Sequence, residues 1–310
     1  MKTVITGGCG FIGSHIAEAL VNDGEEVVIY DNLSSGYEHN IDSFRDKVEF
    51  IKGDVRDLDK LKEVMQGATN VFHEAALVSV FESVEKPYDN HDINLTGTLN
   101  VLTAARDAGA KRLVVASSAA IYGNDPTLPK QETMLPQPES PYALAKITKE
   151  YYLSVFSKLY GLETVSLRYF NVFGPRQDPS SMYSGVISKF VDVITAGQDP
   201  TVFGDGKQTR DFVFVKDIVQ ANLLAMRAPS DVSGCSFNVG TGKRTSLLDL
   251  LDALKEITGK DFTVHFKDVR SGDIRHSVSD ISAATERLGY QPQYDITSGL
   301  KQLLDWKSAI

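Results

Sequence analysis

Tyr142 and Lys146 form the pair of residues in this chain whose types and spacing most directly indicate chemistry. Of the twelve tyrosines, only Tyr142 is followed by a lysine four residues later. Ser140 and Pro141 come directly before it and are typical of a helix N-cap and first turn, so the pair is expected to share one helix face. An ammonium beside a phenol stabilises the phenolate form, which makes Tyr142 a candidate general base. An exposed tyrosine beside a solvated lysine is the alternative interpretation.

A second set of hydroxyl groups follows an apolar run at 112–116, where Ser117 and Ser118 stand. The carboxyl ends of strands in parallel α/β sheets face the ligand crevice, so a hydroxyl there can bond a substrate oxygen that gains or loses a proton. A purely structural role is the alternative for a serine at a strand end. With Tyr142 and Lys146, Ser118 completes the expected catalytic set.

The elements that must position these groups alternate between short β-branched runs and helical patterns. Several of the runs are apolar on both faces, which is typical of central strands covered by helices on both sides. The pattern predicts an α/β fold, a doubly wound parallel Rossmann-type sheet. The expected strands are 3–6, 26–30, 48–51, 70–72, 112–116 and 164–167, and the expected helices are 11–22, 58–65, 93–108 and 141–160.

A glycine-rich turn connects the first expected strand to the first expected helix. Gly7, Gly10 and Gly13 let the backbone turn tightly and approach a pyrophosphate, whose charge then lies at the amides of a helix N-terminus. Three glycines alone are a weak signal, because the chain contains 24 of them. The order of strand, turn and helix gives the motif its weight and predicts a dinucleotide-binding site that includes Phe11 and Ile12.

Asp31 ends the second expected strand, where a carboxylate can accept hydrogen bonds from adenosine ribose hydroxyls. Residues 32–36 contain no Arg or Lys to neutralise a 2′-phosphate, which favours NAD over NADP. A surface aspartate at a strand end is the alternative. Asp54 and Val55, after the third strand, are expected to flank the adenine.

Together these motifs resemble those of the extended short-chain dehydrogenase/reductase family, and within it the nucleotide-sugar 4-epimerases. The match spans nearly the whole chain, through residues 6–13, 31–33, 54–57, 117–123, 141–146 and 168–175. The resemblance implies an NAD-dependent isomerase that interconverts UDP-glucose and UDP-galactose, and also their N-acetylated counterparts, through a transient 4-keto sugar. It further implies that Ser118 holds the reacting oxygen, Tyr142 removes its proton and Lys146 orients the nicotinamide ribose.

Other activities remain open as alternatives. The family's dehydratases and decarboxylases place an Asp or Glu beside the active-site hydroxyl, whereas Ser118 is followed by Ala119 and Ala120, which favours oxidation and re-reduction alone. A reductase, a UDP-glucuronate 4-epimerase with an additional cation for the sugar carboxylate, and a non-catalytic NAD-binding regulator are the remaining candidates.

The resemblance also implies a wider set of cofactor contacts than the motifs alone indicate. The expected NAD-binding residues are Gly7, Gly10, Phe11, Ile12, Gly13, Asp31, Asn32, Ser35, Gly36, Asp54, Val55, Ala75, Ala76, Leu77, Asn94, Tyr142, Lys146 and Phe170.

For the UDP-sugar, the resemblance implies that Arg210 and Arg270 grip the pyrophosphate, for which Arg is well suited. Each arginine is otherwise a solvated surface charge. The expected substrate-binding residues are Ser118, Asn171, Gly185, Val186, Phe203, Arg210, Arg270, Asp273 and Ser277. Asp273 is expected at the uridine ribose and Phe203 near uracil. Gly185 and Val186 stand where some relatives carry Asn-Leu, which leaves that contact to the backbone.

Ser277 matches the position that borders the substituent at sugar C2, where a bulky Tyr excludes an N-acetyl group. A serine leaves room for the acetamide, unless another side chain narrows the pocket.

No metal is expected: His73 and Glu74 resemble the start of a zinc-protease helix, but Leu77 stands where the second His is needed.

Composition and charge limit the other possibilities. The net charge of −9 argues against broad nucleic-acid binding, and Cys9 and Cys235 give no support for a disulfide framework. The sequence shows no apolar run long enough for a membrane span and no signal sequence before the first strand, so a cytoplasmic protein is expected.

The length of 310 residues predicts two lobes. We expect an NAD-binding Rossmann domain at 1–172 and a sugar-nucleotide-binding lobe at 173–310, with segments near 211–239 returning to the main domain. The runs 213–215 and 237–239 are apolar enough to join the main sheet. The resemblance implies a homodimer that pairs through helices 93–108 and 141–160. Tyr151, Val155 and Leu159 fall near one face of the second helix, as such an interface needs; the same stripe facing the sheet is the alternative.

Overall fold

The protein is described by a computed structural model that covers residues 1–178, 185–269 and 274–309. Its core is a seven-stranded, wholly parallel sheet in the order β11-β6-β5-β4-β1-β2-β3. The strands are β1 Lys2–Thr6, β2 Glu26–Asp31, β3 Val48–Lys52, β4 Asn70–His73, β5 Arg112–Ser118, β6 Glu163–Tyr169 and β11 Cys235–Val239. The chain reverses its direction of progress between β1 and β4, and in open sheets of this kind ligands bind at the carboxyl ends of the strands at such a point.

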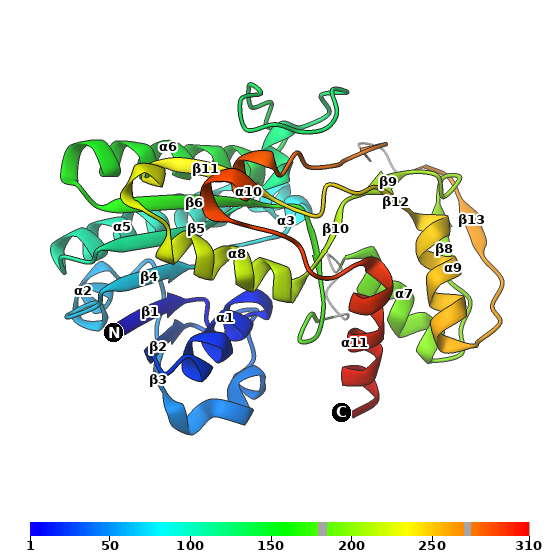
Figure 1. The fold of residues 1–310 in the computed structure, drawn as a ribbon, viewed down its shortest axis with the longest axis horizontal. Coiled ribbons are helices and arrows are strands. Elements are labelled where there is room, and N and C mark those ends of the chain that lie inside the picture. The colour runs from blue at the N-terminus through cyan, green and yellow to red at the C-terminus, as the bar shows by residue number, and fades with distance from the viewer. Residues whose placement is uncertain (179–184, 270–273, 310) are drawn as a thin grey trace.

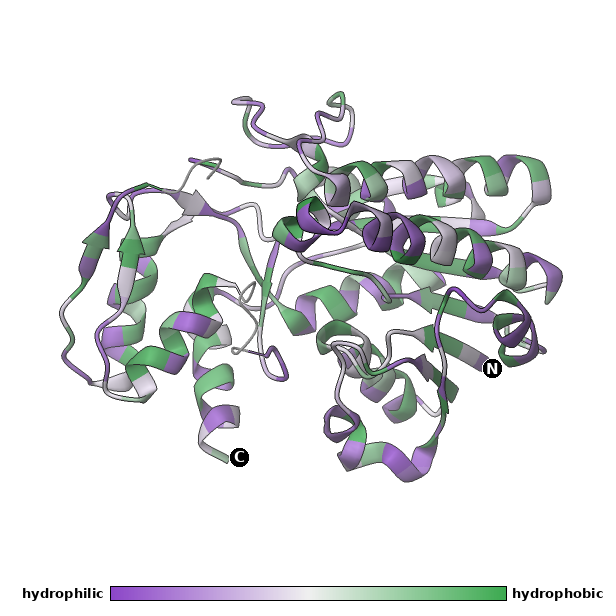
Figure 2. Ribbon diagram, turned by 180° about the vertical axis from the view of Figure 1, so that it is seen from behind, coloured by the Kyte–Doolittle hydropathy of each residue, from purple (hydrophilic) through white to green (hydrophobic). Residues whose placement is uncertain are grey.

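Helices cover both faces of this sheet, as Figure 1 shows. One apolar core lies between the sheet and helices α1 (Phe11–Asn22), α8 (Val215–Arg227) and α10 (Ser282–Leu288). The second lies under α2 (Leu58–Val64), α5 (Gly97–Asp107) and α6 (Pro141–Tyr160). In Figure 2 hydrophobic and hydrophilic residues alternate along these helices, as expected for elements with one buried face. The predicted α/β Rossmann-type fold is thus confirmed.

Two of the four predicted helices agree with the structure to the residue. The bounds of α1 and α6 are those expected, because a glycine turn begins the first and Ser140, Pro141 and Gly161 delimit the second. The expected helix at 93–108 is a π-helical turn, Asp92–Thr96, that continues into α5. A 3-10 segment, Glu38–Lys47, and the helices α3 (Val80–Glu85) and α4 (Pro87–His91) were not expected.

A smaller lobe is built from residues that follow β7 (Asn171–Phe173). Its apolar core lies among α7 (Val186–Thr195), α9 (Leu247–Thr258) and α11 (Ile296–Ala309). Three two-stranded sheets complete the lobe, and Figure 1 shows these elements grouped to one side of the main sheet. Besides β7, which pairs with β10, their strands are β8 Thr201–Phe203, β9 Thr209–Arg210, β10 Phe212–Phe214, β12 Thr245–Ser246 and β13 His265–Lys267.

Of the two later runs that were predicted to join the main sheet, one does so and the other does not. β11 joins the main sheet beside β6, as expected for 237–239. The run at 213–215 does not join that sheet, because β10 pairs with β7 and the chain then enters α8. Val213 packs into the core under α1 and α8, whereas Phe212 and Phe214 pack into the core of the smaller lobe. The run is apolar on both faces because it lies between two cores.

Candidate active site

The glycine turn after β1 has a backbone that only glycine fits. Gly7 adopts φ +74°, and a Cβ added there would lie 2.6 Å from the Ala75 amide nitrogen. A Cβ on Gly13 would lie 2.2 Å from the Gly7 carbonyl oxygen. The helix that follows begins at Phe11 with Gly10 as its N-cap residue, which has no side chain to cover the first amides. The turn therefore offers backbone N–H groups at close approach, as dinucleotide pyrophosphate binding requires.

Asp31 lies directly beside this turn, at the carboxyl end of β2. One carboxylate oxygen accepts a hydrogen bond from the Cys9 amide at 2.9 Å and the other from the Leu33 amide at 2.8 Å. Burial raises the pKa of Asp31, although both amide contacts oppose this. Since these bonds fix the orientation of the carboxylate, it is preorganised to accept further bonds from a ribose.

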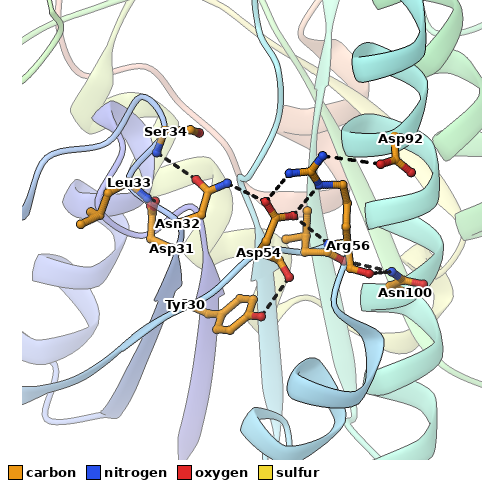
Figure 3. Close-up of polar contacts among 10 residues, drawn as sticks. Tyr30, Asp31, Asn32, Leu33, Ser34, Asp54, Arg56, Asp92 and Asn100 are labelled. Carbon is orange, nitrogen blue, oxygen red and sulfur yellow. Dashed lines mark hydrogen bonds and ion pairs between the residues drawn. The ribbon is translucent and has the colours of Figure 1, made fainter.

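Asp54, at the neighbouring edge of the sheet, is bonded both by Asn32 and by a residue that sequence reasoning left without a role, Arg56 (Figure 3). Its guanidinium donates to both carboxylate oxygens of Asp54, at 2.9 and 2.7 Å, and Asn32 donates to the same carboxylate at 2.9 Å. These contacts, led by Arg56, hold the pKa of Asp54 well below its usual value. Arg56 also lies 3.6 Å from the carboxylate of Asp92.

The network in Figure 3 links the turn after β2 to the turn after β3, where adenine is expected. Asn32 accepts from the Ser34 amide at 2.9 Å, and the hydroxyl of Tyr30 donates to the Asp54 carbonyl at 2.9 Å. The sequence did contain a signal for Arg56, namely its place two residues after Asp54. Its own amide donates to the Asp54 carboxylate at 2.9 Å in the turn that this spacing favours.

The segment after β4 that contains Ala75, Ala76 and Leu77 lies against the glycine turn. The Ala75 amide donates to the Thr6 carbonyl at 3.0 Å. Asn94 both donates to the Leu77 carbonyl at 2.9 Å and accepts from its amide at 3.0 Å. The second amide hydrogen of Asn94 bonds Asn90 at 2.8 Å, so the side chain of Asn94 acts on the site by holding Leu77.

The three expected catalytic residues come from the end of β5 and the first two turns of α6. Ser140 caps α6 by accepting from the Ala143 amide at 3.1 Å, which places Tyr142 in the first turn. The Tyr142 side chain is only 8% exposed. Lys146 donates to the carbonyl oxygen of Ala116 on β5 at 3.0 Å. Because Ser118 ends that strand, this bond ties the helix with the tyrosine to the strand with the serine.

Ser118 and Tyr142 each have a local support. The Ser118 hydroxyl oxygen accepts from the Ala120 amide at 3.1 Å and so caps the short 3-10 helix that follows. The Tyr142 amide donates to the hydroxyl of Ser83 on α3 at 3.1 Å. Ser83 carried no signal in the sequence, since α3 itself was not expected.

Near these residues lies a group of buried or partly buried ionisable side chains to which sequence reasoning assigned no role. Glu74 accepts a 3.0 Å hydrogen bond from the Tyr169 hydroxyl, which accepts one from Asn222 at 2.7 Å. Burial raises the pKa of Glu74 to about 7. Lys149 is fully buried, and this burial, followed by the charge of Lys146, lowers its pKa well below its usual range.

His73 is a core residue rather than a metal ligand in this structure. Its two ring nitrogens contact the hydroxyls of Thr6 at 2.7 Å and Thr98 at 2.9 Å, and burial lowers its pKa well below the usual range. Across residues 1–178, 185–269 and 274–309, no three His, Cys, Asp or Glu side chains are grouped so as to hold a metal ion.

The expected substrate residues lie mostly in the smaller lobe and its junction with the sheet. Asn171 begins β7, Phe203 ends β8, and Arg210 lies on β9. Gly185 is the N-cap residue of α7 and Val186 its first residue. Arg270 and Asp273 lie outside the described residues.

Ser277 and Arg210 are brought together through the residue that precedes Arg210. The Ser277 amide donates to the Thr209 carbonyl at 3.1 Å, and the Thr209 amide donates to the Arg275 carbonyl at 3.0 Å. Phe170, which was expected at the cofactor, packs in a small buried cluster with Ile121, Tyr122 and Ile147 at the end of β5.

Of the helices described, none is both long and apolar enough to cross a membrane.

Comparison with known proteins agrees with this geometry. The model of the NAD dependent epimerase/dehydratase family matches residues 3–240. A UDP-glucose 4-epimerase of Mycolicibacterium smegmatis is 40% identical over 310 residues, which cover 99% of this chain and 98% of the relative.

Two solved structures extend the comparison. A UDP-N-acetylglucosamine 4-epimerase from Methanobrevibacter ruminantium, in complex with UDP-N-acetylmuramic acid, has a TM-score of 0.95 and 39% identity and aligns over 99% of this chain and 98% of its own. A UDP-glucose 4-epimerase of Thermus thermophilus, in complex with NAD, has a TM-score of 0.91 and 38% identity over the full length of both chains.

The chain belongs to the NAD-dependent epimerase/dehydratase family, within the extended short-chain dehydrogenases/reductases. Its cofactor is NAD, and the predicted family resemblance is confirmed. The backbone of the glycine turn and the orientation of the Asp31 carboxylate fit that cofactor.

Proposed function

We propose that the protein is a UDP-hexose 4-epimerase that interconverts UDP-glucose and UDP-galactose, and UDP-N-acetylglucosamine and UDP-N-acetylgalactosamine. The observation that carries the proposal is the arrangement of Tyr142 and Lys146 at the start of α6, tied through Ala116 to the strand that ends in Ser118. Ala119 and Ala120 follow Ser118 directly, so the adjoining turn supplies no carboxylate for dehydration.

In this mechanism the chain's own residues control one proton. Bound NAD would supply the hydride acceptor and donor for C4 of the sugar, so that the configuration there could invert by way of a 4-keto sugar. Tyr142 removes the proton of the 4-hydroxyl and later gives it back to the same oxygen, so no proton is consumed. Ser118 hydrogen-bonds that oxygen, and Lys146 orients the nicotinamide ribose beside Tyr142.

The cofactor contacts are proposed for the residues that the sequence indicated. Asp31 accepts from the adenosine ribose, Asp54 and Val55 flank the adenine, and the amides from Gly10 to Gly13 bind the pyrophosphate. Asn94 contributes by holding Leu77, as its hydrogen bonds indicate.

For the substrate, we assign Arg210 and Arg270 to the pyrophosphate and Asp273 to the uridine ribose. Phe203 packs near uracil and Asn171 contacts the substrate through its amide. Gly185, Val186 and Ser277 complete the proposed substrate-binding set.

We also propose a cytoplasmic homodimer that pairs through α5 and α6. Tyr151, Val155 and Leu159 on α6 are 60%, 45% and 69% exposed, so this apolar stripe faces away from the sheet. The proposed lobe boundary is at 172/173, with α8 and β11 returning to the NAD-binding domain. The dimer is tested by solution scattering: a monomeric mass at micromolar protein concentration would reject it.

The experiment that tests the activity is incubation of the purified protein with UDP-glucose, UDP-N-acetylglucosamine and UDP-glucuronate separately. The products are resolved by chromatography and identified by NMR. We expect a 4-epimer of equal mass from the first two sugars. A product that has lost water or changed oxidation level would identify a dehydratase or reductase, turnover of UDP-glucuronate alone would reassign the substrate, and absence of all turnover would favour a non-catalytic NAD-binding protein.

A further inference from the structure

Asp211 is a fully buried carboxylate, 0% exposed, that follows Arg210 at the end of β9. One of its oxygens accepts from the amide and the hydroxyl of Thr241, at 2.8 and 2.6 Å. The other accepts from the Gly242 amide at 3.1 Å and from the amide and the hydroxyl of Ser279, at 3.0 and 2.5 Å. These five donors are all neutral groups, and they come from two segments of the chain.

The three segments that meet at this carboxylate are distant in the sequence. Asp211 itself lies between β9 and β10, Thr241 and Gly242 belong to the turn after β11, and Ser279 follows the segment with Ser277. The junction is tight, because a Cβ added to Gly240 would lie 2.4 Å from the Ser279 hydroxyl oxygen and 2.6 Å from the Asp211 carboxylate. The backbone carbonyl of Asp211 also accepts from the Asn171 amide at 3.0 Å.

This junction lies next to the residues assigned to the sugar nucleotide. Segment 275–277 is docked on Thr209 by the two backbone hydrogen bonds described above and by a 2.9 Å contact between the Thr209 hydroxyl and the His276 ring. Asp211 fixes the same segment on the other side of Arg210, through Ser279. The position of Ser277 relative to Arg210 is thus set from both sides.

We propose that Asp211 is a positioning residue for UDP-sugar binding, which holds Arg210, Asn171 and the Ser277 segment in one geometry. The inference rests on the proposed substrate roles of those residues. A carboxylate suits the task because its two oxygens can accept five hydrogen bonds, and bonds to an ionised acceptor are stronger than neutral ones. An asparagine would replace one oxygen by an amide that faces donors already in place.

The test compares Asp211→Asn with a matched control, Asp217→Asn. Asp217 on α8 is also buried, at 1% exposure, and also accepts from neutral backbone donors, the amides of Gln293 at 2.7 Å and Tyr294 at 3.2 Å. It has no described bond to the 275–279 segment. Both variants are therefore expected to lose thermal stability, whereas only Asp211→Asn is expected to weaken substrate binding.

The probe is UDP alone, titrated by calorimetry into the NAD-loaded protein, with NAD affinity measured separately. Asp211→Asn should weaken UDP binding by about tenfold or more and raise KM for UDP-hexoses more than it lowers kcat, with NAD affinity within about twofold of wild type. Unchanged UDP affinity in Asp211→Asn, or an equal loss in Asp217→Asn, would overturn the inference.

A milder variant keeps the test decisive if Asp211→Asn does not fold. Ser279→Ala removes one of the five donors and should weaken UDP binding in the same direction by roughly twofold to fivefold; unchanged affinity would again count against the proposal. Wild-type protein that binds UDP but does not epimerise any UDP-hexose would overturn the proposed function and leave this comparison valid.

Discussion

The ammonium nitrogen of Lys146 lies 5.4 Å from the centre of the Tyr142 ring, one helical turn further along α6. The same nitrogen donates to the Ala116 carbonyl at 3.0 Å, so its position is fixed by the main sheet and not by the helix alone. Because both groups are already held in place, little side-chain entropy is lost in bringing them together at the site. This relationship makes Tyr142 the residue to test first.

Replacing Tyr142 by Phe keeps the shape and burial of the ring and removes the hydroxyl that exchanges a proton. Turnover of UDP-glucose should fall roughly 10²-fold or more, while UDP binding changes little. Steady-state kinetics and UDP calorimetry check the two halves of the prediction. Tyr152→Phe, on the same helix and outside the apolar stripe proposed for the dimer, is the control and should retain activity. Near wild-type turnover in the Tyr142 variant would remove this residue from its proposed role.

Asp31→Ala should weaken NAD binding selectively. The carboxylate that is proposed to accept from the ribose hydroxyls is also bonded to the amides of Cys9 and Leu33, so its removal leaves the glycine turn less well fixed. We expect an increase of about tenfold or more in the Kd for NAD.

Fluorescence titration with NADH and NADP measures this change. Asp23→Ala is the control for loss of a surface charge. Asp23 follows the C-terminal end of α1, away from the glycine turn, and forms an exposed ion pair with Arg227. Unchanged NAD affinity for Asp31→Ala, or a wild-type protein that binds NADP as tightly as NAD, would contradict the assignment.

Glu74→Gln is expected to stabilise the protein increasingly as pH rises. The folded-state pKa of Glu74 is raised to about 7, above its ordinary value, so the folded state retains the proton better than the unfolded chain. This contribution to stability is fully present below the unfolded pKa and is lost as pH rises through about 7. Gln stays uncharged and keeps an acceptor for the Tyr169 hydroxyl. The difference in unfolding free energy should grow in favour of the variant by on the order of 2 kcal/mol between about pH 5 and pH 8.

Urea unfolding at a series of pH values measures this difference. Glu256→Gln, an exposed position on α9, serves as the control and should show no such trend. A difference for Glu74→Gln that is constant across the range, or that grows toward acid pH, would show that Glu74 is ionised in the folded protein.

The parts of the fold that sequence predicted are those with local signals. The bounds of α1 and α6 follow from Gly10, Pro141 and other residues that act on their immediate neighbours. Ser118 and Asp31 end their strands as expected, because strand ends are marked by a change from apolar to polar residues.

The parts that sequence did not predict depend on contacts between distant segments. Nothing beside Lys149 in the sequence shows that it is buried near Glu74, since β4 and α6 are far apart in the chain. Asp211 meets its donors only after β11 and the 275–279 segment have docked. The run at 213–215 was predicted to join the main sheet because burial between two cores gives the same apolar pattern as burial under two layers of helices.

The final prediction concerns which sugars the site admits. Ser277 is half-buried and held to Thr209 by its backbone amide, so a side chain introduced at this position has a defined direction of approach. If Ser277 borders sugar C2 as proposed, serine leaves space for an acetamide there, whereas overlap with an aromatic ring is relieved only if the segment moves. Ser277→Tyr should therefore abolish turnover of the N-acetylated pair, by about 10²-fold or more, and largely spare UDP-glucose and UDP-galactose. The measurement is kcat/KM for both pairs, with Ser308→Tyr on the exposed side of α11 as the control for an added tyrosine. An unmodified enzyme inactive on UDP-N-acetylglucosamine, or equal losses on both pairs in Ser277→Tyr, would show that another part of the pocket sets the size limit at C2.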